Sequence, residues 1–224
     1  MNRPNPENLT PLSQLASSLP SAESDAATPP QDLQQSPESD RIGMDESKSP
    51  QELIDWALQK FADQPIVMTS SFGMEGCMLM DMCSKAITKY GLDKLTIACI
   101  DTGFFFPETK QLQKKLIARY ENLNFVTWET PVSVEQQAKS YGPNLWQYNP
   151  NLCCNIRKVQ PMSENVVNYN LWITAVRRSQ TSSRANTPVI GWDWRYELLK
   201  FCPLVTLSRA EVWKYIQDND VPFN

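Results

Sequence analysis

Two adjacent cysteines, Cys153 and Cys154, are the residues whose type and spacing point most directly to chemistry in this sequence. Adjacent cysteines rarely form a disulfide with each other, because the ring that they would close is strained. As neighbouring thiolates they could ligate a soft metal centre, and iron–sulfur clusters take four cysteines. The residues alone leave a second interpretation open, in which both are small buried thiols without a chemical role.

The remaining cysteines and the lack of histidine limit the chemistry further. Cys77, Cys83, Cys99 and Cys202 lie in helix or strand patterns or beside a proline, so we expect them in the core. The sequence contains no histidine, which excludes Ser-His-Asp and Cys-His catalysis and HExxH zinc sites. Six cysteines without a signal-peptide pattern are typical of a reducing compartment, where they are thiols or metal ligands.

A cluster of arginines at 177–184 could bind an anion. This segment contains Arg177, Arg178 and Arg184 among hydroxyl and amide side chains. A guanidinium group can bind two phosphate or sulfate oxygens at once. Such a cluster is more informative on an acidic chain, although a solvated surface loop explains it equally well. Further candidate anion contacts, each of which is more often a surface charge, are Arg157, Lys158 and Lys200.

A serine-containing loop follows the first apolar run that we expect to be a strand. This serine loop consists of Ser70, Ser71, Phe72 and Gly73, and a helical pattern starts near Glu75. Backbone N–H groups and the helix dipole favour an anion at such a position. The loop matches neither GxGxxG nor GxxxxGK[ST], so phosphate binding and a plain capped turn both remain open.

A second polar turn, formed by Asp101, Thr102 and Gly103, ends the next apolar run. The carboxylate of Asp101 could accept hydrogen bonds from a ribose or an adenine amino group, or the turn could simply cap the helix that follows. Ligands of open α/β sheets collect at the carboxyl ends of the strands. We therefore expect this turn to face the same crevice as the serine loop.

The elements that must position these residues alternate along the chain. Predicted strands cover 65–69, 95–100, 124–127 and 171–175, and predicted helices cover 50–61, 75–90, 107–120 and 133–140, with a last helix after Ser208. Capping boxes mark the starts of the first and last helices, and Gly91 is expected to close the second. The alternation predicts an α/β fold, a doubly wound parallel sheet with helices on both faces.

Composition sets the domain boundary. Every Trp, Tyr, Phe and Cys lies at or beyond Trp56, whereas residues 1–48 are rich in Pro, Ser, Asn, Gln, Asp, Glu and Ala. A segment of that composition buries too little apolar surface to offset its ordering entropy. We therefore predict a disordered N-terminal tail at 1–48 and one globular domain at 49–224.

Charge and hydropathy limit the partners. A net charge of -4 and a pI near 5.0 argue against a general nucleic-acid binder, which needs a basic surface. No apolar run approaches the roughly 20 residues that span a bilayer, and the N-terminal residues lack the apolar core of a signal peptide. We expect a cytoplasmic protein that binds neither nucleic acid nor membrane.

Seven segments, taken together and in order, resemble the phosphoadenylyl-sulfate and adenylyl-sulfate reductase family of sulfate assimilation. They are SSFGMEG at 70–76, IDTGFFFPET at 100–109, YGPNLW at 141–146, CCNIRKVQPM at 153–162, ITAVRRSQTSSRA at 173–185, LLKFCPL at 198–204 and VWKYIQDNDVPFN at 212–224. Each motif is weak alone, but their shared order is specific. The resemblance implies a Rossmann-like fold of the adenine nucleotide alpha hydrolase-like type.

The resemblance also implies a reaction and a substrate site. In the family, a cysteine thiolate attacks the sulfur of adenylyl sulfate or phosphoadenylyl sulfate, AMP or its 3'-phosphate leaves, and thioredoxin or glutaredoxin releases sulfite. A homo-oligomer is compatible with this family. The implied substrate contacts are Ser70, Ser71, Phe72, Gly73, Asp101, Thr102, Gly103, Lys158, Arg177, Arg178 and Arg184.

The cysteine pair indicates a branch of the family. Members with such a pair hold a [4Fe-4S] cluster, completed by a CxxC further on, and mostly use adenylyl sulfate. Cys153 and Cys154 would then be two of the four ligands. The CxxC and the Glu-Cys-Gly-Leu-His segment of the family would follow Asn224, so we expect a C-terminally truncated, inactive chain whose nucleophilic cysteine lies beyond Asn224.

Two alternatives remain at the level of sequence. The first is an enzyme of the same fold that adenylates its substrate with ATP, although such enzymes use an SGGxDS loop that the serine loop does not match. The second is a catalytically inactive regulator that binds a cluster or a nucleotide. Turnover of ATP would indicate the first, and tight binding without turnover would indicate the second.

Overall fold

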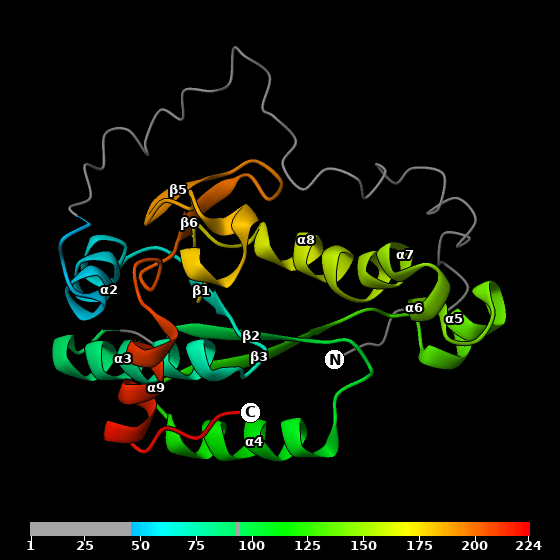
Figure 1. Cartoon of the computed structure of the whole chain (residues 1–224), viewed down its shortest axis with the longest axis horizontal. Coiled ribbons are helices and arrows are strands. Elements are labelled where there is room, and N and C mark those ends of the chain that lie inside the picture. Colours follow the sequence, from blue (N-terminus) through cyan, green and yellow to red (C-terminus); the bar gives the residue numbers. More distant parts are fainter. Residues whose placement is uncertain (1–45, 93–94) are drawn as a thin grey trace, which may run out of the picture.

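The computed structural model describes residues 46–92 and 95–224 (Figure 1). The tail predicted at 1–48 lies outside the described residues except for 46–48, which form a turn, so its disorder stays a prediction. The described residues form one mixed sheet with helices packed on it. Among these residues no helix combines the length and the apolar character that crossing a membrane requires.

The sheet has the strand order β3-β2-β1-β4-β6-β5. Its strands are β1 (Ile66–Thr69), β2 (Thr96–Asp101), β3 (Asn124–Glu129), β4 (Leu171–Ile173), β5 (Ile190–Asp193) and β6 (Leu198–Phe201). Neighbouring strands from β3 to β6 are parallel, and β5 pairs antiparallel with β6 through a tight hairpin. The predicted α/β class and mostly parallel sheet are confirmed, but the antiparallel edge was not predicted.

Helices connect the strands as the alternation predicts. The α-helices are α2 (Pro50–Lys60), α3 (Met74–Tyr90), α4 (Pro107–Arg119), α5 (Val134–Tyr141), α6 (Leu145–Tyr148), α7 (Pro150–Cys154), α8 (Gln160–Val166) and α9 (Arg209–Asp218). The capping boxes at Ser49 and Ser208 are both present. Gly91 ends α3 with φ 61°, the left-handed conformation that glycine adopts without steric cost.

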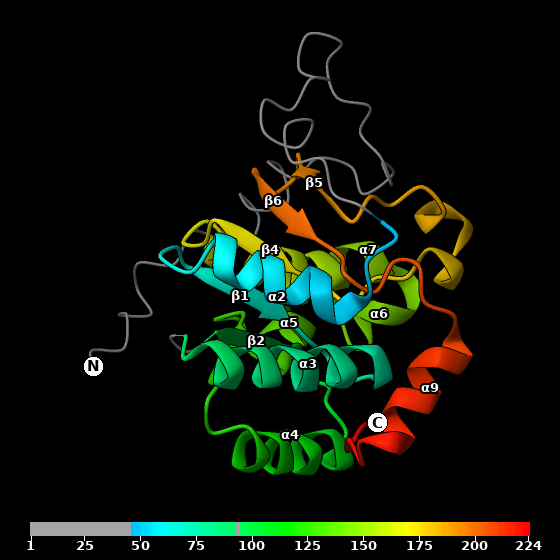
Figure 2. The ribbon, with the colours of Figure 1, turned by 90° about the vertical axis from the view of Figure 1, so that its left-hand side faces the viewer.

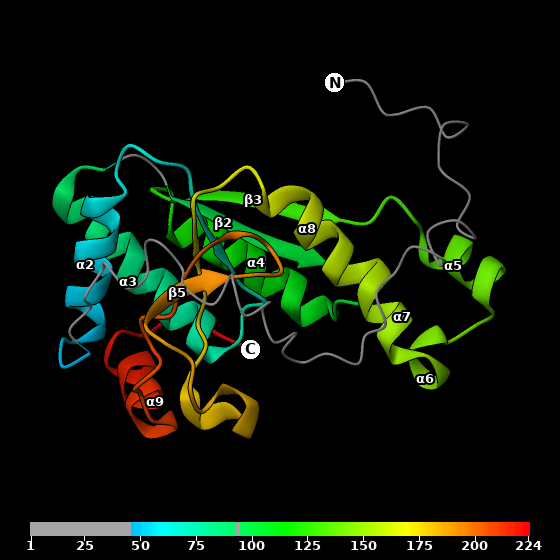
Figure 3. The same ribbon diagram turned by 90° about the horizontal axis from the view of Figure 1, so that it is seen from above.

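The segment 150–166 forms a run of helix that periodicity did not reveal. A π-helical turn, η4 (Asn155–Val159), joins α7 to α8, and the N–H of Gln160 donates to the carbonyl of Asn155, five residues back. Pro161 follows directly and has no N–H with which to continue an α-helical ladder. Figure 3 shows α5, α6 and α7 extending beyond the helices that cover the sheet.

Strand residues alternate between two apolar layers. Met68 and Ile97 belong to the larger core, which contains side chains of α2, α3, α4 and α9. Val67 and Ala98 point to the opposite side, where they pack with residues of α8. Figure 2 shows α2, α3 and α4 stacked on one side of the molecule. The carboxyl ends of β1, β2 and β4 therefore lie at one edge, between the two layers.

The four cysteines predicted to be core residues are buried. Burial raises the pKa of Cys77, Cys99 and Cys202 to about 12 from the ordinary value of 9.0, and it raises the pKa of Cys83 further. Neutral thiols are thus the form that the folded state requires. The four side chains pack in the core.

We predict a steep loss of stability in alkali. Each buried thiol stays protonated in the folded protein above pH 9 while the unfolded chain loses the proton, so the free energy of unfolding falls as pH rises from about 9 to about 12. The slope is about 1.4 kcal/mol per pH unit and thiol. Urea unfolding at pH 8 to 10, in reductant and chelator, measures it.

The variant Cys77→Ala should remove one thiol's share of that slope, because its site no longer carries a titrating group. Exposed Cys154 supplies the matched control, and Cys154→Ala should leave the slope unchanged. Equal slopes in all three proteins would contradict the assignment of the alkaline transition to buried thiols.

Candidate active site

The serine loop is held rigidly where β1 ends. The N–H of Ser70 donates to the carbonyl of Ala98 on β2 (3.0 Å), and the hydroxyl of Ser70 accepts from the N–H of Phe72 (3.0 Å). Phe72 is fully buried although its φ is 64°, a conformation that is unusual for an aromatic residue. The thiol of Cys77 donates to the Phe72 carbonyl (3.2 Å). Core packing therefore fixes the backbone of this loop.

The loop leads directly into the N-terminus of α3. Gly73 is the N-cap residue and makes no side-chain capping hydrogen bond, so no N-cap side chain competes for the first N–H groups of the helix. Ser71 is exposed beside it. A helix N-terminus without a side-chain cap attracts anions. The predicted anion position is thus open to a ligand.

Arg177 connects this helix to the arginine cluster. Its Nε and Nη2 atoms donate to one carboxylate oxygen of Glu75 on α3 (3.1 and 2.7 Å), and Nη1 donates to the Ser179 hydroxyl (2.7 Å) and the Leu207 carbonyl (3.3 Å). Burial alone would raise the pKa of Glu75, but the hydrogen bonds and charge of Arg177 outweigh it, so that pKa lies below its ordinary value. Arg177 is buried and its three nitrogens are engaged, so it orders the loop.

Arg178 and Arg184 lie nearer the surface. Both terminal nitrogens of Arg178 donate to the carboxylate of Glu46 (3.0 and 2.7 Å), and its Nε donates to the carbonyl of Thr187 (2.8 Å). The hydrogen bond with Arg178 lowers the pKa of Glu46. Arg184 is exposed and donates to the amide oxygen of Gln180. Of the three arginines, Arg178 and Arg184 could turn toward a ligand.

A cavity of about 660 Å³ opens where these pieces meet. Its lining comes from the start of α3, the arginine loop, the start of α9 and the last residues of the chain: Gly73, Met74, Glu75, Arg177, Ser179, Gln180, Ser208, Arg209, Trp213, Phe223 and Asn224. The lining combines a helix N-terminus, Arg209, the Arg177–Glu75 ion pair and two aromatic side chains. Such a lining suits an anionic ligand with a planar ring.

The Asp101 turn lies at the same edge of the sheet, next to β1. The carboxylate of Asp101 accepts from the N–H of Gly103 (2.8 Å), and the hydroxyl of Thr102 accepts from the N–H of Phe104 (3.4 Å). Asp101 therefore closes its own turn but does not cap α4, whose N-cap residue is Phe106 without a side-chain capping hydrogen bond. The guanidinium of Arg157 donates to the carbonyl of Thr102 (3.2 Å) and so joins the turn to η4.

Arg157 is buried with an incomplete set of partners. Its Nε donates to the side-chain oxygen of Gln137 on α5 (2.8 Å), and its guanidinium lies over the ring of Phe104 (5.3 Å). Its Nη2 atom has no hydrogen-bond partner among the described residues. Burial lowers the pKa of Arg157, and the nearby Cys153, Glu135 and Asp101 oppose that shift. An unpaired buried donor in a π turn is typical of a functional position.

Cys153 and Cys154 have different environments although they are consecutive. Cys153 is buried and accepts a hydrogen bond from the amide of Gln137 (3.8 Å), whereas Cys154 is exposed. Within residues 46–92 and 95–224, no group of three or more His, Cys, Asp or Glu side chains could hold a metal ion. An iron–sulfur cluster takes four cysteines, so a cluster held by these two thiols would need two further ligands.

The predicted residues thus fall into two groups. The serine loop and Arg177 form one group, while the Asp101 turn, Arg157 and Cys153 form the other. Lys158 is exposed beside the second group, and Lys200 instead pairs with Asp193 on the β5–β6 hairpin (3.0 Å). Sequence reasoning missed the roles of Glu75 and Gln137. Their arginine partners lie 102 and 20 positions away in the chain, so no local pattern marks either residue.

The protein-family model described as the phosphoadenosine phosphosulfate reductase domain matches residues 65–224 of this chain. The chain belongs to this family. It is 34% identical over 180 residues to proteins named adenosine 5'-phosphosulfate reductase from Bacillus cytotoxicus and Bacillus cereus, which covers 80% of this chain and 74% of each relative.

Solved structures agree with this membership. The phosphoadenylyl-sulfate reductase of Candida auris, determined as a phosphate complex, is 32% identical with a TM-score of 0.65, covering 79% of this chain and 82% of that one. An ammonia-dependent NAD synthetase from Campylobacter jejuni, 16% identical, has a TM-score of 0.54 and covers 80% of this chain and 75% of that one. This second likeness concerns the fold alone, and both likenesses agree with the expected Rossmann-like α/β fold.

A pair of glycine substitutions tests the packing of the serine loop. A Cβ atom at Gly76 would lie 2.5 Å from the Ser70 hydroxyl, whereas one at Gly73 meets nothing within 4 Å. Gly76→Ala should displace that hydroxyl from the N–H of Phe72 and cost about 1–3 kcal/mol of unfolding free energy. Gly73→Ala should change it by less than about 1 kcal/mol. Urea unfolding distinguishes the two, and equal losses would contradict the prediction.

Proposed function

We propose that this chain binds a sulfonucleotide and takes part in its thiol-dependent reduction to sulfite and AMP for cysteine biosynthesis. Adenylyl sulfate is the proposed substrate, with phosphoadenylyl sulfate as the alternative. The observation that carries the proposal is the cavity at the N-terminus of α3, next to the arginine loop, in a chain 34% identical to named adenylyl-sulfate reductases.

We propose that the two groups of residues contact the substrate from opposite sides. The backbone of Ser70, Ser71, Phe72 and Gly73 would donate to the anionic end, because the N-cap residue Gly73 has no side chain that occupies this position. Arg178 and Arg184 would supply charge at the rim, and Arg177 would hold the loop through Glu75. Asp101, Thr102, Gly103 and Lys158 would contact the substrate from the other side.

The proposed reaction transfers the sulfo group of the substrate from a phosphate oxygen to a cysteine thiolate. A thiolate attacks the sulfate sulfur, the bond from sulfur to the phosphate oxygen breaks, and AMP leaves with the electron pair. A thiol of thioredoxin or glutaredoxin then attacks the S-sulfocysteine and releases sulfite. The backbone N–H groups at the start of α3 and the exposed arginines would stabilise the leaving phosphate.

We propose that none of the six cysteines in this sequence is the nucleophile. Burial raises the pKa of Cys77, Cys83, Cys99 and Cys202 and leaves them protonated, and Cys153 and Cys154 are assigned to the cluster.

We also propose that Cys153 and Cys154 are two of four ligands of a [4Fe-4S] cluster. Bound there, the cluster would link α7 to the segment that supplies the other two thiolates. Arg157 could then donate its unpaired Nη2 hydrogen to a sulfur or substrate oxygen. Free thiols and an iron–sulfur cluster both fit a cytoplasmic, reducing location.

Calorimetric titration under anaerobic conditions tests the substrate assignment. Adenylyl sulfate and AMP should bind, and ATP should not be turned over. Sulfite should form from adenylyl sulfate only when the nucleophilic cysteine and thioredoxin are both present. Failure to bind either adenylyl sulfate or phosphoadenylyl sulfate would refute the proposal. Turnover of ATP would instead support an adenylating enzyme of the same fold.

The ion pair of Arg178 gives a further prediction about affinity. Glu46→Gln should release the guanidinium of Arg178 for the ligand and tighten AMP binding about two- to fivefold, the range expected for a partly exposed ion pair. Glu164→Gln on α8 changes the net charge equally at an exposed position and is the control. Calorimetry at low salt measures both, and an equal gain in the control would show a general charge effect.

A further inference from the structure

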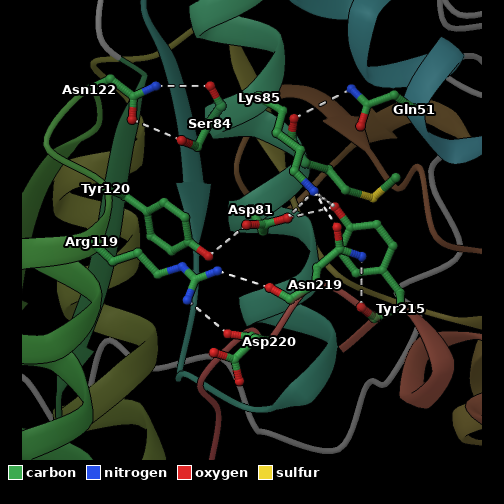
Figure 4. Close-up of polar contacts among 11 residues, drawn as sticks. Gln51, Asp81, Ser84, Lys85, Arg119, Tyr120, Asn122, Tyr215, Asn219 and Asp220 are labelled. Atoms are coloured by element: carbon green, nitrogen blue, oxygen red, sulfur yellow. Dashed lines mark hydrogen bonds and ion pairs between the residues drawn. The ribbon is translucent and has the colours of Figure 1, made fainter. Parts of the chain in front are cut away.

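A buried carboxylate, Asp81, joins three helices at a distance from the proposed site. It lies in α3 with 4% exposure and accepts from the hydroxyls of Tyr120 (2.9 Å) and Tyr215 (2.7 Å), while Lys85 Nζ lies 2.7 Å away (Figure 4). Tyr120 follows the last residue of α4, and Tyr215 belongs to α9. Burial and the Asp81 charge raise the pKa of both tyrosines, so both remain donors. A buried charge needs such partners.

The same cluster closes the end of α9. Arg119 donates from Nη1 to the carbonyl of Asp220 (2.8 Å) and from Nη2 to that of Asn219 (3.0 Å), and Lys85 donates to the side-chain oxygen of Asn219 (2.6 Å) (Figure 4). The last carbonyls of a helix have no partner within the helix, and a cation there is favoured by the dipole. The end of α9 is thus fixed to α3 and α4.

From this anchor the segment 219–224 runs to the serine loop. The N–H of Asn224 donates to the carbonyl of Phe72 (3.2 Å), and its side-chain amide donates to the hydroxyl of Thr109 (2.8 Å). The ring of Phe223 packs edge-on against Trp213 (5.5 Å between centroids), and both line the cavity at the start of α3. One wall of the cavity therefore depends on where α9 is held.

We propose that Asp81 is a positioning residue for the nucleotide site, which holds α9 and the segment 219–224 against the serine loop. The identity of the ligand rests on the proposed function. Docking of the segment and binding of the ligand then favour each other, because the segment contacts the loop and walls the same cavity. The coupling must be reciprocal.

Asp55 provides a matched comparison for a purely structural role. It accepts from Lys89 (2.7 Å), the hydroxyl of Tyr90 (2.9 Å) and the amide of Gln51 (2.8 Å), so it shares a lysine and a tyrosine donor with the Asp81 network. It joins α2 to α3, and α9 takes no part in its hydrogen bonds. Loss of either network should destabilise the fold, but only loss of the Asp81 network should displace residues that line the cavity.

The test compares Asp81→Asn with Asp55→Asn in the full chain. Amide hydrogen exchange is followed over 209–224, and AMP and adenylyl sulfate binding are measured by calorimetry. Asp81→Asn should speed exchange in that segment about tenfold and weaken AMP binding about three- to tenfold, whereas Asp55→Asn should do neither. AMP should also slow exchange at 219–224 in the unmodified protein.

Milder variants keep the test decisive if Asp81→Asn does not fold. Tyr215→Phe and Tyr120→Phe each remove one hydroxyl donor, and Tyr215→Phe should affect exchange and affinity more, because Tyr215 belongs to α9 itself. Equal effects of the Asp81 and Asp55 variants, or unchanged exchange and affinity in the Asp81 variant, would overturn the proposal. If the unmodified protein binds neither nucleotide, the proposed function fails, while the exchange comparison still tests the anchor.

Discussion

The ion pair between Arg177 and Glu75 joins the loop after β4 to the first turn of α3, and the carboxyl edge of the sheet takes its shape from it. Parallel strands leave their ends free, so the loops that follow them need contacts of their own. Here a buried guanidinium uses its three nitrogens to hold a carboxylate, a hydroxyl and a carbonyl. Its charge is neutralised by Glu75, so attraction of an anion falls to the backbone of α3 and to more exposed arginines.

The two sides of the site differ in how completely their polar groups are paired. On the α3 side the polar groups are paired or are backbone donors at a helix start. On the other side, Arg157 is withdrawn from water by η4 and α5, with one nitrogen unpaired among the described residues. A buried cation without a full set of partners is costly in isolation, so a ligand that accepted from this nitrogen would remove part of that cost.

Local signals in the sequence predicted much of the fold. Ser49 and Ser208 began helices as their capping boxes indicated, and the apolar runs at 65–69 and 95–100 became neighbouring parallel strands. The β5–β6 hairpin and the helical run at 150–166 were not predicted, since four-residue strands and a π turn carry no clear period. Residue types at the site were recognised, but the partners were not, because Arg177 and Glu75 are 102 positions apart.

The conformation of Phe72 has a consequence for the rate of association. Its ring is fully buried and its backbone is held in a left-handed conformation, so folding and not ligand binding sets the curvature of the serine loop. A preorganised loop loses little conformational entropy when it binds a ligand. Association is then not slowed by a rearrangement of the loop. Capture of an anion at this loop should therefore approach the rate of diffusional docking, with any slower adjustment confined to other parts of the cavity.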